Sequence, residues 1–135
     1  MSPSIPDALA MRALKYGSAS DAQKDAVAGA LRQAGRRAEA LLLFEGRPEA
    51  PFLREELAWA VEHGVAFHLL ALARLGVPVR RDDYAACAVA AEKAGRWMDA
   101  RQCHVALEDA AGLARIAPHL PESLRPEPPA EAEEA

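Results

Sequence analysis

Aromatic residues make up only 5% of this chain, and cysteine occurs only twice. Two cysteines in 135 residues do not form a disulfide framework, so we expect reduced thiols and a cytoplasmic protein. The glycine-rich strings that bind nucleotide phosphates are missing, and the few serines fall at predicted caps, in loops or in the tail. The sequence therefore predicts no bound cofactor or metal and no enzyme activity.

Long apolar runs and an excess of basic charge are also missing. The most hydrophobic stretch, 65–75, is about half as long as a membrane span, and charged residues interrupt the N-terminal segment where a signal peptide would lie. The formal net charge of −4 belongs to residues 121–135, which hold five Glu and one Arg. Residues 1–120 carry the remaining 15 basic and 15 acidic residues, so we expect neither nucleic acid nor membrane as a partner.

Alanine, by contrast, supplies roughly a quarter of the chain, far above its average use. Because alanine is the best helix former, the composition predicts an all-α fold. Gly35, Gly64 and Gly95 each separate two helix-like apolar patterns, at intervals of 29 and 31 residues. Repeats of this length indicate stacked antiparallel helical hairpins, a short α-solenoid. We expect one helical repeat domain over 1–120 and a disordered Pro/Glu-rich acidic tail over 121–135.

Apolar periodicity and cap residues predict about seven helices. The first starts after Ser4 with Pro6 in its first turn, and Leu9 belongs to its buried stripe. The second starts at a capping box formed by Ser20 and Gln23. The remaining helices are expected over 36–45, 51–63, 65–75, 83–94 and 97–107, with a short helical turn over 113–117; the helix over 65–75 reads as the central buried one.

Residues 81–112 form the best-patterned hairpin. Its apolar and small residues are Tyr84, Cys87, Ala88, Ala91, Ala100 and His104. Their spacing resembles the tetratricopeptide repeat, in which W-x2-L-G-x2-Y is followed by a small residue and then an aromatic residue four positions later. Ala91 and His104 depart from that pattern, Gly112 stands where proline is usual, and the period is shorter than 34 residues. The resemblance covers about 90 residues and is weaker around Gly35 and Gly64, so a non-repeating helical bundle is the alternative.

The resemblance implies a concave groove lined by the first helix of each hairpin, which receives a segment of another protein. In this register the partner-binding residues are Asp25, Gly29, Arg32, Arg54, Ala58, Val61, Ala85, Val89 and Glu92. Small apolar residues stand where some relatives clamp a terminal carboxylate, so an apolar or amphipathic helix is the expected ligand. The alternative is that Ala58 and Val89 pack against other helices of this chain or against a second copy.

Other residues with possible chemistry fit structural roles better. Cys103 and His104 point about 100° apart on a helix, so they do not readily bind one metal ion together. Cys87 and Cys103 read as small buried hydrophobic residues, and His104 reads as a histidine at the edge of the core. The adjacent acids Glu55 and Glu56 read as solvated helix residues.

The sequence thus predicts an interaction module that acts as an adaptor, a scaffold or a chaperone for one client. The main alternative is a structural subunit that associates with itself through the same apolar surface. A metal or thiol sensor built on the Cys and His residues is a more distant alternative.

Overall fold

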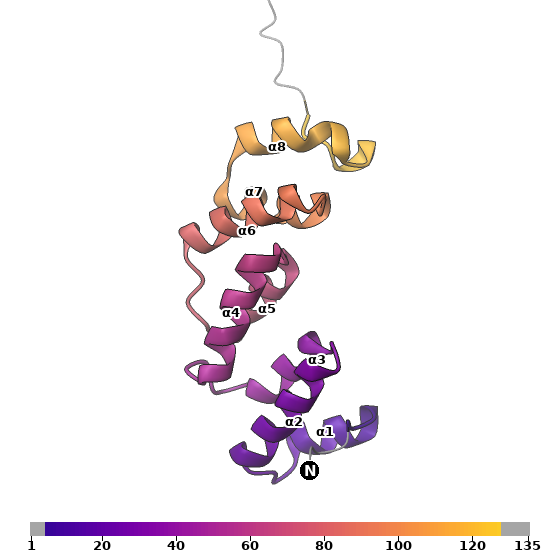
Figure 1. Cartoon of the computed structure of the whole chain (residues 1–135), viewed down its shortest axis with the longest axis vertical. Coiled ribbons are helices and arrows are strands. Elements are labelled where there is room, and N and C mark those ends of the chain that lie inside the picture. The colour runs from indigo at the N-terminus through magenta and orange to yellow at the C-terminus, as the bar shows by residue number, and fades with distance from the viewer. Residues whose placement is uncertain (1–4, 128–135) are drawn as a thin grey trace, which may run out of the picture. The chain divides into compact units, whose positions relative to one another are not determined.

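The computed structural model describes residues 5–127, and in this part of the chain every regular element is a helix. Figure 1 follows the α-helices in chain order. The all-α prediction is confirmed, while the stacking of hairpins into a short solenoid stays a prediction. The helices are α1 (Ala8–Tyr16), α2 (Asp21–Gln33), α3 (Arg37–Leu41), α4 (Pro51–His63), α5 (Ala66–Arg74), α6 (Arg81–Lys93), α7 (Trp97–Leu107) and α8 (Ala110–Ile116), with 3-10 turns η1 (Leu42–Phe44), η2 (Ala117–His119) and η3 (Glu122–Leu124).

The three turn glycines end α2, α4 and α6 in the same way. Gly35, Gly64 and Gly95 have φ angles of 78°, 70° and 72°, a left-handed conformation that costs other residues energy. After each glycine, a backbone N–H donates to the carbonyl five residues earlier, as in a Schellman motif. These bonds are Arg36 N to Leu31 O at 2.8 Å, Val65 N to Ala60 O at 2.9 Å and Arg96 N to Ala91 O at 2.8 Å. The predicted turn positions are confirmed.

Side-chain hydrogen bonds mark the starts of α2 and α6. The Gln23 N–H donates to Ser20 Oγ at 3.2 Å and the Ser20 N–H donates to Gln23 Oε1 at 2.8 Å, which confirms the predicted capping box before α2. Helix α6 starts at Arg81, two residues earlier than predicted. There Asp83 lies in the first turn and accepts the backbone N–H of Arg80 at 2.8 Å.

Helix α1 differs from its prediction at both its start and its buried face. It begins at Ala8, because the Asp7 carboxylate accepts a backbone N–H of the first turn at 2.8 Å. Pro6 therefore precedes the helix. Leu9, predicted to be buried, is 78% exposed, and Met11 is the buried residue of the helix. Within residues 5–127, this short helix thus presents an apolar face that is left exposed at Leu9 and Tyr16.

The chain divides into two compact units, and α4 and α5 contribute residues to both. The first unit comprises Met1–Ala58 and Leu70–Pro78, and the second comprises Trp59–Leu69 and Val79–Ala135. Large apolar side chains form the core of the first unit. They are Met11, Val27, Leu31, Leu41, Leu43, Phe44, Leu53, Leu72 and Val77.

A carboxylate is buried among these apolar residues. Glu56 is fully buried and accepts hydrogen bonds from Arg32 Nε at 2.8 Å and from the guanidinium of Arg37. The Arg32 guanidinium lies over the Phe52 ring, 3.8 Å from its centroid. The prediction that Glu55 and Glu56 are both solvated was wrong for Glu56, because arginines from two other helices neutralise it there.

Small side chains dominate the core of the second unit. The buried residues there include Ala60, Ala66, Cys87, Ala88, Ala91, Ala100 and Cys103, with Leu69, Ile116 and Leu120 as the larger members. Small residues let helix backbones approach closely, as the positions of Ala88 and Ala100 predicted. Helix α5 is less buried than predicted, because Phe67 is 52% exposed.

The predicted acidic tail begins with ordered structure. Residues Glu122–Leu124 form the 3-10 turn η3, and Arg101 Nε donates to the carbonyl of Leu124 at 3.4 Å. The helical part of the chain therefore continues past residue 120. The remainder of the tail, 128–135, lies outside the described residues.

Candidate partner-binding groove

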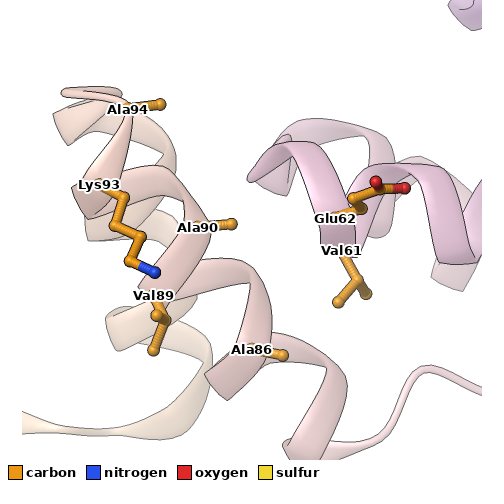
Figure 2. Close-up of a pocket in the computed structure, with 7 residues that line it drawn as sticks. All are labelled: Val61, Glu62, Ala86, Val89, Ala90, Lys93 and Ala94. Carbon is orange, nitrogen blue, oxygen red and sulfur yellow. The ribbon is translucent and has the colours of Figure 1, made fainter.

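The second unit carries an apolar groove between the C-terminal part of α4 and one face of α6. Its volume is about 550 Å³. Figure 2 shows Val61 and Glu62 on α4, across from Ala86, Ala90 and Ala94 of α6. The lining residues are Val61, Glu62, Ala86, Val89, Ala90, Lys93 and Ala94.

Alkyl groups make up most of this lining. Ala86, Ala90 and Ala94 recur every fourth residue, so they stand in one row along α6. Val89 lies beside this row and is 59% exposed, and Val61 is half-buried on the opposite wall. A row of methyl groups leaves room for an incoming side chain between the walls, whereas longer side chains would fill it.

Close contacts between hairpin ends fix the two walls of the groove. A Cβ added at Gly64 would lie 2.4 Å from the backbone nitrogen of Ala91, so the turn after α4 packs directly on the α6 backbone. Arg96 Nε donates to the Gly64 carbonyl at 3.3 Å. The buried carboxylate of Asp99 accepts the N–H of Ala66 at 2.9 Å, which caps the start of α5. Contacts made by the turns after α4 and α6 therefore hold the two walls of the groove together.

Two of the predicted partner-binding residues, Val61 and Val89, line the groove. Ala58 and Ala85 are exposed but are not part of its lining. The exposure of Ala58 and Val89 shows that neither packs in the core of this chain. Sequence reasoning missed the alanine row by one residue, since the register on α6 pointed to Ala85. The four-residue spacing of alanines was the signal that could have identified it.

Glu92, another predicted partner-binding residue, belongs to a network on the other side of α6. It accepts hydrogen bonds from His104 Nε2 at 2.8 Å and from the guanidinium of Arg115 at 2.8 Å. Burial opposes ionisation, but the bonds from Arg115 and His104 keep the pKa of Glu92 below its ordinary value. The buried Nδ1 of His104 lies 3.4 Å from Asp109 Oδ2 and has no hydrogen-bond partner among the described residues. Glu92 thus joins α6 to α7 and α8.

The predicted residues in the first unit have separate surroundings of their own. Arg32 binds Glu56 and Glu55, and Arg47 binds the carboxylate of Asp25 at 2.8 Å. Gly29 is half-buried with open space beside its Cα, and Arg54 lies exposed near the Glu49 carbonyl. Two of these four residues, Asp25 and Arg32, are engaged in ion pairs.

The cysteines occupy the interior of the second unit. Cys87 and Cys103 are both fully buried, and the Cys87 thiol lies 3.7 Å from the carbonyl of Ala60. Their mutual hydrogen bond and burial raise the pKa of the Cys103 thiol, which makes it a poor nucleophile. Among residues 5–127, no three His, Cys, Asp or Glu side chains are arranged to hold a metal ion.

Comparisons with protein-family models, curated proteins and solved structures gave no match to this chain. Nor does any helix within residues 5–127 have the length and apolar character that crossing a membrane requires. The tetratricopeptide resemblance therefore stays a prediction.

Proposed function

We propose that this chain is a protein–protein interaction module that binds an amphipathic helical segment of another protein in the groove between α4 and α6. The observation that carries the proposal is the exposure of Val89, 59%, beside a row of alanine methyl groups on α6. Exposed apolar side chains that line a depression are typical of recognition sites. A helix with an apolar stripe is the ligand that such a groove suits.

The chemistry of the lining favours binding over reaction. Alkyl side chains, one carboxylate and one ammonium group offer an apolar helix a surface to bury. In this role the protein is an adaptor or a chaperone that covers the apolar face of one client. A client helix would bury Val61 and Val89 together with its own stripe, at about 25 cal/mol for each Å² of apolar area removed from water.

The test compares wild type, Val89→Arg and Val105→Arg. Each protein is used to capture partners from a lysate of the source cell. The captured protein is identified by mass spectrometry, and its binding segment is then titrated by calorimetry against all three. We expect Val89→Arg to weaken binding at least about tenfold, because a guanidinium fills the apolar groove. Val105 is 46% exposed on α7 outside the groove, so Val105→Arg is the matched control and should bind as wild type does.

Both variants replace exposed side chains, and their circular dichroism and melting should match the wild type. Equal affinity of the three proteins for the captured segment would contradict the proposal. So would a captured segment with no helical apolar stripe.

A second candidate, a subunit that associates with itself, is favoured by the uncovered face of α1. Ile5, Leu9 and Tyr16 on or next to this helix are 41%, 78% and 71% exposed. Sedimentation equilibrium of the wild type over a hundredfold concentration range tests this role. A dimer that dissociates in Leu9→Glu supports self-association, whereas a monomer at every concentration contradicts it.

A further inference from the structure

One charge stands on each wall of the groove. Glu62 lies on α4 and Lys93 on α6, and both are exposed lining residues. Among residues 5–127, no ion pair or hydrogen bond engages either charged group, unlike Glu92 one position before Lys93. Figure 2 shows Lys93 extending along α6 toward Val89, and Glu62 on α4 with its carboxylate directed away from α6.

The apolar part of the groove between these charges is short. The last alanine of the row, Ala94, lies eight positions after the first, Ala86, which is roughly 12 Å along the helix. A partner helix therefore buries about two turns there, and few apolar contacts distinguish one alignment from another. The charges beside the alanine row therefore contribute strongly to the orientation of the bound helix.

From the proposed binding of an amphipathic helix, we infer that Glu62 and Lys93 fix the direction in which the partner runs along the groove. The partner that fits has basic residues along the edge facing α4 and acidic residues along the edge facing α6. A helix whose apolar face points into a groove exchanges its two edges when its N-to-C direction is reversed. Reversal of such a partner therefore replaces two attractive pairs by two repulsive ones.

Each exposed pair contributes little by itself, and a like-charged pair costs a similar amount. Reversal loses two attractive pairs and gains two repulsive pairs, so four small energies add up. The favoured direction should therefore be populated roughly tenfold over the other. Edge charges thus set direction, while the alkyl lining supplies most of the affinity.

The experiment uses three stapled helical peptides of about 15 residues with the same Leu/Ala stripe. Viewed with the apolar stripe facing the reader and the N-terminus at the top, the first peptide has Arg along its left edge and Glu along its right edge. The second peptide has these two edges exchanged, and the third has Gln along both. Each carries a nitroxide at its N-terminus, and broadening of the amide signals of Ala86 and Ala94 is measured on the full ¹⁵N-labelled chain. The first peptide should broaden one of these signals, the second should broaden the other, and the third should broaden both.

The variant Glu62→Lys/Lys93→Glu exchanges the wall charges and should reverse the result for the two charged peptides. If the peptides bind but broaden both signals alike, or if the exchanged variant gives the wild-type pattern, the inference is wrong and the groove proposal stands. If none of the three peptides binds at millimolar concentration, while a partner segment captured from the lysate binds elsewhere, both proposals are wrong.

Discussion

The first unit fills its interior with Leu and Phe side chains around a buried carboxylate, whereas the second uses alanine, cysteine and close backbone contact. The turn glycines show the consequence. A Cβ at Gly35, in the first unit, would meet nothing within 4 Å, but a Cβ at Gly64, in the second, would lie 2.4 Å from the Ala91 nitrogen. Gly35 is thus required only for its left-handed backbone conformation, whereas Gly64 is required both for that conformation and for close packing.

The largest predicted loss of stability tests this difference between Gly64 and Gly35. Gly64→Ala should destabilise the protein by about 3 kcal/mol, because it adds a collision with the α6 backbone to left-handed strain. Gly35→Ala, the matched control, should cost only about 1 kcal/mol of strain. Urea unfolding followed by far-UV circular dichroism measures both. Equal losses of stability would mean that Gly64 has no packing role.

The next prediction concerns the buried charge of the first unit. Glu56→Gln should destabilise by about 2 kcal/mol, because it leaves Arg32 and Arg37 without their shared carboxylate. Both arginine side chains are about a quarter exposed, which limits the loss through rehydration. Glu55→Gln is the control, since its side chain is 64% exposed and should change stability by less than about 0.5 kcal/mol. A stable Glu56→Gln would show that the ion pairs are dispensable.

The smallest expected effect is a pH dependence in the second unit. The pKa of Glu92 lies below its ordinary value of 4.5, and the Gly112 N–H lowers the pKa of Asp109 below 3.8. Folding therefore favours the ionised form of both carboxylates. Their contribution to the free energy of unfolding is fully present at pH values above these ordinary pKa values. It is lost as pH falls through the lowered folded values. Urea midpoints between pH 6 and pH 3 should fall more steeply for wild type than for Glu92→Gln, and parallel slopes would contradict the assignment.

The start of α2 and the turn that ends it were predictable because their signals are local. The Ser20–Gln23 capping box and the glycine at position 35 each depend on residues within one turn of the helix. Glu56 could not be predicted in the same way. Its partners lie 24 and 19 residues away on other helices, so only the tertiary fold brings them together. Leu9 was misassigned because a nine-residue helix has too few periodic positions to show which face is covered.

The partner-binding role of the groove stays a prediction, and two of the residues predicted for it line the pocket. Val61 and Val89 were identified because the turn glycines fix the phase of α4 and α6. Ala86 was missed because the register pointed to Ala85 and the four-residue spacing of Ala86, Ala90 and Ala94 was not used. The exposed charges Glu62 and Lys93 were also missed, because a charge on a helix surface is the usual case and distinguishes no site until the groove is seen.

The distribution of chromophores and thiols allows the two units to be followed separately. Both tryptophans, Trp59 and Trp97, and both cysteines, Cys87 and Cys103, belong to the second unit. Indole fluorescence and thiol alkylation therefore report on opening of that unit alone, whereas far-UV circular dichroism reports on all helices. Curves that coincide would show one cooperative transition, and curves that separate would measure the free energy that couples the two units.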